Sequence, residues 1–287
     1  MPGAVQNAIC VDADDLAGSV HEAGLGRHPG DSDVAGETHA LLEAFDALGL
    51  RATFFVPGHF VQDAPDLVRV MAASGHEVAS HGTRHSPVSH FSPAEFLEDV
   101  RTSRCALEDL VGRRVETYKA PIWSITPRCL WAYDVLLEAG IRVDHSAMPG
   151  VVAGLGRRRG ELEPFRYRDE LVVIPVTTVE VLGFALPFPG GFYNAWVPAA
   201  IQQRVYDGIN RRKLPFNFYF HPFEHSPAPS KRRLVKYRSL YVSLYAAHSG
   251  RYRSILARMA ERYPLGTLES AYARWLTPSS VGGDIET

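Results

Sequence analysis

The chain has 287 residues and a formal net charge of −2 at pH 7. Hydrophobic residues make up 46% of it and charged residues 22%, values typical of a globular protein with a sizeable core. The near-zero net charge excludes a nucleic-acid-binding surface spread over the whole molecule, so we expect no nucleic-acid partner. No stretch approaches the ~20 apolar residues of a membrane-spanning helix.

Cysteine usage indicates a reducing compartment. Cys10, Cys105 and Cys129 form no C-x-x-C motif, and an odd number of cysteines cannot pair completely. The first residues lack the basic region and the long apolar run of a secretory signal peptide. The sequence therefore predicts a cytoplasmic protein.

The first half of the chain alternates between strand and helix patterns. We expect strands at residues 8–11, 52–56, 77–81, 116–120 and 142–144, with helices between them at residues 38–48, 64–74, 93–111 and 127–139. A glycine closes each helix, and Ser92-Pro93-Ala94-Glu95 has the form of a capping box. Successive β/α units favour a parallel sheet or barrel whose site lies at the C-terminal ends of the strands.

The second half is less regular. Past Gly150 we expect strands at 171–178 and 216–220, a loop at 187–196, a helix at 197–212, two helices within 232–263 that are broken at Gly250, and a disordered tail at 279–287. No linker or second core is indicated. Residues 1–287 are therefore interpreted as one domain.

Polar residues follow five of the expected strands. They are Asp12, Asp14 and Asp15, then His81 and His85, Lys119, Asp144 and His221. A single Asp or His after a strand is most often a cap or a core hydrogen-bonding group. Five such positions, which converge on one face of a β/α barrel, favour a functional site.

The spacing of His81 and His85 is that of two ligands of one divalent metal ion. Both imidazoles can reach a single ion at about 2.0–2.1 Å, with Gly82 permitting the tight turn between them. A third, anionic ligand is needed, and Asp14-Asp15 offers a ligand next to a general base. Asp12 lies two residues earlier on the same strand face, so it is an alternative base.

With these motifs the chain resembles the polysaccharide deacetylase family, carbohydrate esterase family 4, over residues 8 to about 270. The resemblance implies a distorted (β/α)7 barrel, here with a helical C-terminal extension. It implies Asp14 as the base and Asp15, His81 and His85 as ligands of one divalent ion. Zn is expected, and Co, Ni or Mn are alternatives. Gly82 replaces the family's usual Ser or Thr.

Two further segments match family motifs. Lys119-Ala120-Pro121-Ile122-Trp123 falls at Arg-x-Pro, which implies that the Ile122 amide helps to hold an oxyanion. Asp144-His145-Ser146 matches Asp-x-Ser, whose aspartate orients the general-acid histidine, here His221. Lysine at 119 lacks the planar fork of arginine. The segment at 220–224 is most similar to the bacterial branch associated with exopolysaccharide synthesis.

The resemblance implies removal of an N-acetyl group from an amino sugar. The absent signal peptide favours a small, nucleotide-linked or carrier-linked sugar, or a natural-product glycan. Alternatives are hydrolysis of another C–N bond, in a formamide or ureide, and a non-catalytic carbohydrate-binding barrel. Glu224 is a candidate cap or substrate contact. Candidates for sugar stacking, each with core packing as its alternative, are Trp123, Phe192, Tyr193 and Trp196.

Overall fold

The computed structural model describes residues 4–14, 33–149, 162–182, 184–188, 190–191, 196–225 and 251–277. The expected tail at 279–287 and the first helix expected within 232–263, before the break at Gly250, lie outside these ranges. Among the helices that are described, none has the length and apolar character needed to cross a membrane.

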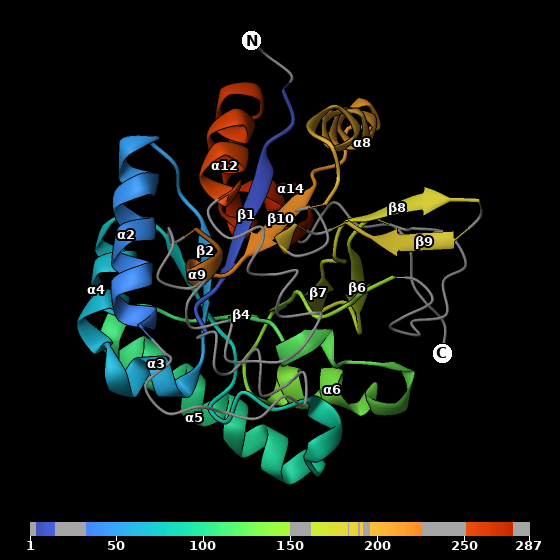
Figure 1. Cartoon of the computed structure of the whole chain (residues 1–287). Helices are drawn as coiled ribbons and strands as arrows, with labels where there is room; N and C mark the ends of the chain where they lie inside the picture. Colours follow the sequence, from blue (N-terminus) through green and yellow to red (C-terminus); the bar gives the residue numbers. More distant parts are fainter. Residues whose placement is uncertain are drawn as a thin grey trace, which may run out of the picture.

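A curled sheet forms the centre of the molecule (Figure 1). Seven strands run parallel in the order β10-β1-β2-β3-β4-β5-β7, and β6 (Phe165–Tyr167) continues the sheet as an antiparallel edge. β11 (Leu265–Gly266) also pairs with β1. The seven are β1 (Asn7–Asp12), β2 (Thr53–Val56), β3 (Glu77–Ser80), β4 (Thr117–Tyr118), β5 (Val143–Asp144), β7 (Leu171–Val173) and β10 (Asn217–Phe220).

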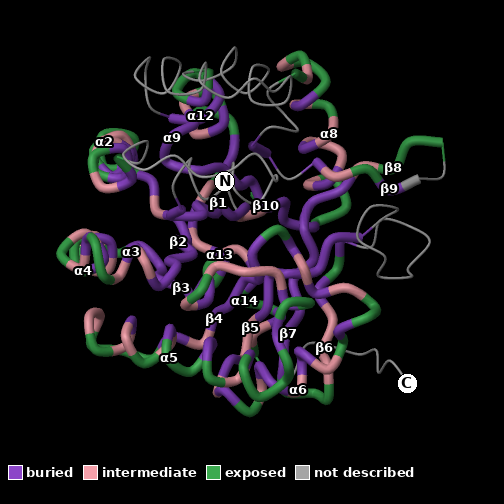
Figure 2. The backbone as a smooth tube through the Cα atoms, turned by 60° about the horizontal axis from the view of Figure 1, so that its bottom comes forward, coloured by how far each residue is buried: buried purple, intermediate pink, exposed green. Residues whose placement is uncertain are grey.

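Helices surround this sheet, with their buried sides toward the strands and their exposed sides outward (Figure 2). All six residues of β1 are buried, as expected for a parallel strand covered on both faces. The helices are α2 (Val34–Ala47), α3 (Gly58–Asp63), α4 (Pro65–Ala73), α5 (Pro93–Val111), α6 (Trp131–Glu138), α8 (Ala199–Arg211), α9 (Pro222–His225), α12 (Arg251–Arg262), α13 (Leu268–Ala271) and α14 (Ala273–Leu276). Short 3-10 turns are η1 (Val88–His90), η2 (Pro121–Trp123) and η3 (Pro127–Cys129).

Side chains and one backbone bridge connect the two sides of the curled sheet. Asn217 in β10 accepts a hydrogen bond from the Thr177 amide at 2.8 Å, and its own amide donates to the Thr177 hydroxyl at 2.8 Å. Gly190 bridges to Tyr219 with φ +113°, where a Cβ would stand 2.4 Å from the Tyr219 carbonyl oxygen. The expected α/β fold is therefore confirmed, with its sheet curled into a half-barrel.

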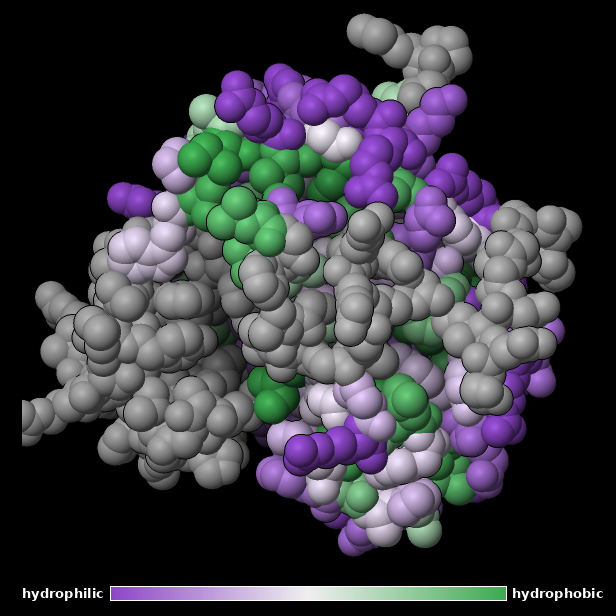
Figure 3. Space-filling view, turned by 90° about the vertical axis from the view of Figure 1, so that its right-hand side faces the viewer, coloured by the Kyte–Doolittle hydropathy of each residue, from purple (hydrophilic) through white to green (hydrophobic). Residues whose placement is uncertain are grey.

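Two antiparallel hairpins were not expected from the sequence: β6 with β7 at the edge of the main sheet, and β8 (Thr178–Val181) with β9 (Phe184–Pro187) in a second sheet. The strand expected at 171–178 is wrong as one element, because β7 ends at Val173 and β8 pairs with β9 in a separate sheet. The side of the molecule that carries this second hairpin shows apolar surface beside strongly polar surface (Figure 3). At the hairpin turn Leu182 is 93% exposed.

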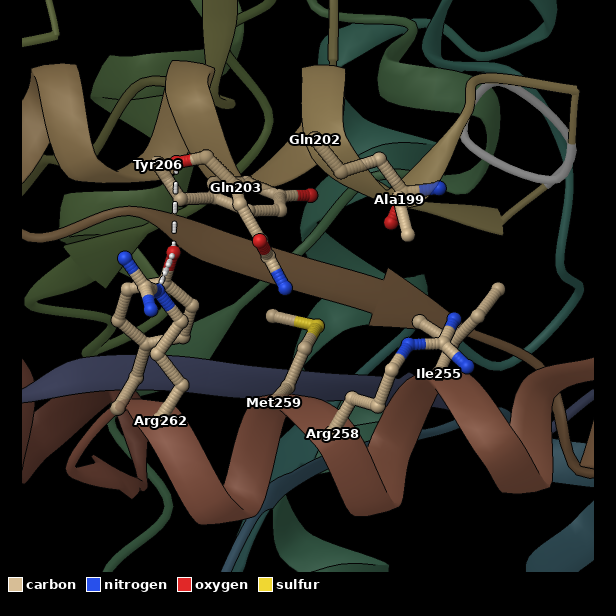
Figure 4. Close-up of a pocket in the computed structure, with 9 residues that line it drawn as sticks. Ala199, Gln202, Gln203, Tyr206, Ile255, Arg258, Met259 and Arg262 are labelled. Atoms are coloured by element: carbon tan, nitrogen blue, oxygen red, sulfur yellow. Dashed lines mark hydrogen bonds between the residues drawn. The ribbon is translucent and has the colours of Figure 1, made fainter.

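Two cavities lie away from the C-terminal strand ends. One of about 20 Å³ between α8 and α12, lined by Tyr206 and Met259 among others, has room for about one water molecule (Figure 4). Another of about 430 Å³ is lined by the first residues of β3, β4 and β5 and by mixed arginine and glutamate side chains. Parallel α/β barrels carry out their chemistry at the opposite strand ends.

Candidate active site

The C-terminal strand ends gather the polar residues that the sequence singled out. Asp12 ends β1 and Asp144 ends β5, whereas His81, Lys119 and His221 directly follow β3, β4 and β10. All five side chains are buried. Because these strands are parallel and in register, their ends lie at one edge. The contacts below bring together Asp12, Asp14, His81, His85, Lys119 and His221.

Lys119 forms a buried ion pair with Asp12. Its ammonium donates a hydrogen bond to Asp12 Oδ2, and no ion pair with Asp14 is found within the described ranges. Three aromatic rings surround the ammonium, with Nζ 5.4 Å from the ring centre of Phe55, 4.4 Å from Trp123 and 4.5 Å from Tyr219. The side chain therefore points into the site, as the sequence predicted, but its carboxylate partner is Asp12.

This pairing sets the charge of Asp12. Burial by itself would raise the pKa of the carboxyl, but the Lys119 ammonium, with His221, lowers the pKa of Asp12 to about 2. Asp12 Oδ1 is buried and has no hydrogen-bond partner among the described residues. The carboxylate is thus ionised at neutral pH and keeps one oxygen available.

Asp14 lies between two histidines. Its Oδ2 is 3.4 Å from Nε2 of His85, and its Oδ1 is 3.5 Å from Nε2 of His221. Two ligand atoms bound to one Zn ion at about 2.0–2.1 Å stand about 3–3.5 Å apart, so Asp14 and His85 have the spacing of two ligands. Asp15, the expected ligand, lies outside the described residues.

His81 has a fixed tautomer. Its Nδ1 is 2.7 Å from the Lys119 carbonyl oxygen, which can only accept, so Nδ1 carries the proton and Nε2 is left as an acceptor. Nε2 is 4.0 Å from Asp12 Oδ2, and the ring centres of His81 and His85 are 4.8 Å apart. Burial holds the pKa of His81 well below its usual value, so the ring is neutral, as a metal ligand requires.

These donors fit a borderline divalent ion in kind: neutral imidazole nitrogens beside a carboxylate. The orphaned Asp12 Oδ1 and the Nε2 acceptor of His81 are the buried atoms that such an ion, or a water bound next to it, would satisfy. Over the described ranges no three His, Cys, Asp or Glu side chains are grouped closely enough to form a complete metal site.

The orienting partner of His221 differs from the expected one. Glu224 Oε2 accepts hydrogen bonds from the His221 amide at 2.7 Å and lies 3.0 Å from His221 Nδ1. Burial alone would lower the pKa of His221, but Asp14 and Glu224 raise it to about 9. Asp144 makes no hydrogen bond or ion pair with His221 in the described structure, so the expectation that Asp144 orients this ring is corrected.

Asp144 instead binds its own turn. Its Oδ1 accepts from the Ser146 hydroxyl at 2.5 Å and its Oδ2 from the Ser146 amide at 3.1 Å, while Ser146 Oγ accepts from the Ala120 amide at 2.7 Å. The carboxyl is fully buried, and this burial raises its pKa to about 7. Asp144 thus anchors the backbone just before Pro121.

That backbone is strained. Ile122 has φ 49° and ψ 28°, and Trp123 has φ 50°. A positive φ is an outlier for a β-branched residue and costs about 1–3 kcal/mol, so the surrounding contacts must impose it. In the described structure the Ile122 amide has no hydrogen-bond acceptor, and the residue is 54% exposed. The amide is therefore available to a ligand, as its expected oxyanion role requires.

The expected aromatic subsite is only partly testable. Trp123 is buried and packs edge-to-face on Tyr219 with ring centres 4.7 Å apart, so it is part of the wall around Lys119 and not an open stacking surface. Trp196 is 46% exposed. Phe192 and Tyr193 lie outside the described residues.

Sequence reasoning missed Asp99, whose carboxylate binds the backbone between His81 and His85. It named Glu224 as a candidate cap, and Glu224 does accept from the His221 amide, but it did not foresee that the same carboxylate lies beside His221 Nδ1. Asp99 carries no local signal, because it lies 16 residues from Thr83.

Parts of the chain are similar to known protein families and to known proteins. Residues 30–142 match the family "Polysaccharide deacetylase", and residues 145–269 match "Domain of unknown function (DUF3473)". A peptidoglycan deacetylase from Helicobacter pylori is 33% identical over 148 residues, 49% of this chain and 49% of that protein. A chitooligosaccharide deacetylase from Bradyrhizobium sp. is 35% identical over 97 residues, 33% of this chain and 42% of that protein. The chain thus spans about half, or less, of the length of these relatives.

Solved structures confirm the fold. A candidate polysaccharide deacetylase from Mycobacterium smegmatis superposes with a TM-score of 0.58 at 17% identity, covering 100% of this chain and 97% of that one. The Bc1960 peptidoglycan N-acetylglucosamine deacetylase gives a TM-score of 0.50 at 12% identity, covering 93% and 87%. The chain is therefore similar to the polysaccharide deacetylase family over residues 30–142, and residues 145–269 match a domain of unknown function.

Proposed function

We propose that this protein is a metal-dependent hydrolase that removes an N-acetyl group from an amino sugar. The observation that carries the proposal is that Asp12, held by Lys119, and His221, held by Glu224, lie at one strand edge with Asp14, His81 and His85. Amide hydrolysis needs a base for the attacking water and an acid for the leaving amine. The similar relatives are named as peptidoglycan and chitooligosaccharide deacetylases.

Asp12 is our choice for the base, where the family motif alone favours Asp14. Lys119 holds Asp12 and keeps it ionised, whereas Asp14 faces His85 at a ligand-like spacing. Asp14, His81 and His85, with Asp15 as the alternative carboxylate, would hold the ion. A bound divalent ion, Zn with Co, Ni or Mn as alternatives, lowers the pKa of a water and polarises the acetyl carbonyl.

The remaining steps belong to the chain's own groups. Asp12 accepts the proton of the attacking water. The Ile122 amide donates a hydrogen bond to the developing oxyanion, and losing such a donor typically costs about 3–4 kcal/mol of transition-state stabilisation. His221, protonated at neutral pH and held by Glu224, gives its proton to the leaving amine. Residues 145–269, the region without a known function, thus supply the acid.

The role of each aspartate can be separated by substitution. Asp12→Asn should abolish acetate release and keep the metal, whereas Asp14→Asn should lose both, with Asp15→Asn as the matched comparison. Zn content by mass spectrometry and acetate release from N-acetylglucosamine derivatives are the two readouts. Loss of metal in Asp12→Asn with retention in Asp14→Asn would reverse the assignment.

The reaction class needs its own test. Acetylated amino sugars, free or nucleotide-linked, are compared with formamides and ureides under identical metal conditions. Turnover only of formamides or ureides would replace deacetylation by the alternative C–N hydrolysis. Sugar binding without any turnover would leave a non-catalytic barrel. The cytoplasmic location and the exopolysaccharide-associated branch stay predictions.

A further inference from the structure

We infer that Asp99, on helix α5, is the positioning residue that sets the backbone between His81 and His85. This inference rests on the proposed function, because those two histidines are metal ligands only within it. Among the described residues, the hydrogen-bond partners of Asp99 in this loop are Thr83 and Arg84, not the two rings. It acts on the three residues that join them, Gly82, Thr83 and Arg84.

Four hydrogen bonds run from this short loop to Asp99. Oδ2 accepts from the Thr83 amide at 2.9 Å, and Oδ1 accepts from the Arg84 amide at 2.9 Å and from Arg84 Nε at 3.3 Å. The Asp99 carbonyl oxygen accepts from the Thr83 hydroxyl at 2.7 Å. Asp99 is buried on a 19-residue helix whose N-terminal capping box is complete, so the anchor is rigid.

The loop needs such an anchor because its backbone is unusual at both ends. Gly82 has φ +76° and His85 has φ 48°. A non-glycine residue at positive φ, such as His85, is held there by surrounding contacts. Two consecutive amides bound to one carboxylate fix Thr83 and Arg84, and with them the direction in which the His85 side chain leaves the chain.

The same carboxylate explains the glycine at position 82. A Cβ there would stand 2.8 Å from Asp99 Oδ2, closer than real Cβ contacts come. Asp99 therefore occupies the space into which a Ser or Thr at position 82 would project its side chain. Gly82 and Asp99 therefore act together: the glycine leaves space for the Asp99 carboxylate, which holds the loop from helix α5.

The test is the Zn affinity of Asp99→Asn. The amide nitrogen would face one of the two backbone donors, so the loop loses a hydrogen bond while the side-chain volume is kept. We expect the Kd for Zn to rise about 10–100-fold, as for other groups that orient ligands. The visible spectrum of the Co-loaded protein should change as well. The control is Asp109→Asn, an exposed position on the same helix.

Equal Kd values and Co spectra for Asp99→Asn and the unaltered chain would overturn this inference alone. An unaltered chain that binds no Zn would overturn the proposed function, and this role with it. If Asp99→Asn does not fold, hydrogen exchange in the unaltered chain decides. The amides of Thr83 and Arg84 should exchange as slowly as those inside α5, and exchange at the rate of an open loop would refute the anchor.

Discussion

At the scale of single residues, the lysine at position 119 decides how the site is charged. A lysine offers a point charge without the two-pronged grip of arginine, and here the rings of Phe55, Trp123 and Tyr219 enclose that charge. The rings fix the ammonium against Asp12 by packing and cation–π attraction. A guanidinium at this position would be larger than the ammonium that these rings surround.

Lys119→Met removes the charge and keeps most of the side-chain volume. Without the ammonium the pKa of Asp12 rises, so the acid limb of the kcat/KM profile should move upward by about 1–3 pH units. The rate at neutral pH should fall while Zn content stays unchanged. Lys119→Arg keeps the positive charge, but its rate should still be below that of the unaltered chain, because the guanidinium is larger than the ammonium between the three rings. An acid limb that stays in place in Lys119→Met would disprove the pairing.

His221 governs the other limb. Asp14 and Glu224 raise its pKa to about 9, and an acid works only while it is protonated, so the rate should fall as pH rises through this region. His221→Ala should lose the alkaline limb and most of its turnover while Zn still binds. Glu224→Gln, which weakens support for the imidazolium, should move the limb to lower pH. A wild-type alkaline limb in His221→Ala would remove it as the acid.

Asp144 links stability to pH. Burial raises its folded pKa to about 7 from the ordinary 3.8, so between these values the folded chain keeps a proton that the unfolded chain has released. The stability from this group is therefore complete below about pH 4 and is lost as pH rises toward 7, at up to about 1.4 kcal/mol per pH unit.

Urea unfolding of the unaltered chain and of Asp144→Asn at pH 5 and pH 7 checks this linkage. The variant cannot titrate at this position, so its free energy of unfolding should change less between the two pH values. Other titrating groups are common to both proteins and cancel in the difference. Identical pH dependence in the two proteins would show that Asp144 is ionised in the fold.

At the scale of elements, sequence motifs predicted the ends of helices correctly where neighbouring residues determine those ends. The capping box of α5 is present in both directions, with the Ser92 amide bonded to Glu95 at 2.8 Å and the Glu95 amide bonded to Ser92 at 3.4 Å. Gly112 ends the helix with φ +67°, as predicted. The hairpin between β6 and β7 escaped prediction because its turn uses Arg168 and Asp169 at φ 47° and 56°, where glycine or asparagine is the usual signal.

The position of the candidate site could be predicted from the sequence, but the pairing of its side chains could not. Strand ends place Asp12, His81 and Lys119 at one edge whatever the details of packing. Asp12 and Asp14 are two residues apart on one face, so the strand pattern cannot say which of them meets Lys119. That choice, and the roles of Asp99 and Glu224, depend on contacts between distant elements.

At the scale of the whole molecule, the two matched regions share one sheet. The first region supplies β2, β3 and β4, and the second supplies β6, β7 and β10. β1 precedes the first region and joins β10 to β2, and β5 lies between the regions and joins β4 to β7. The Asn217 side chain accepts a hydrogen bond from the Thr177 amide across the curled sheet. Its Nδ2 also donates to the Pro175 carbonyl at 2.9 Å and to the Tyr272 hydroxyl at 3.0 Å. We therefore propose a single folding unit.

Asn217→Ala tests this unity. It leaves buried partners unsatisfied, each at a cost of about 1–3 kcal/mol, so the free energy of unfolding should fall by several kcal/mol. Hydrogen exchange followed by mass spectrometry should show β3 and β4 losing protection together with β10. Glu180→Ala, at an exposed position, is the control. Unchanged protection of β3 and β4 would mean that the regions unfold independently.

The most direct test of the whole account is a Zn titration of the metal-free protein with acetate release from an N-acetylated amino sugar as the readout. We expect no turnover without metal, and added Zn should raise turnover to a plateau at about one Zn per chain. His81→Ala should neither bind the ion nor release acetate. Turnover that is unaffected by metal removal, or metal binding that is equal in His81→Ala, would contradict it.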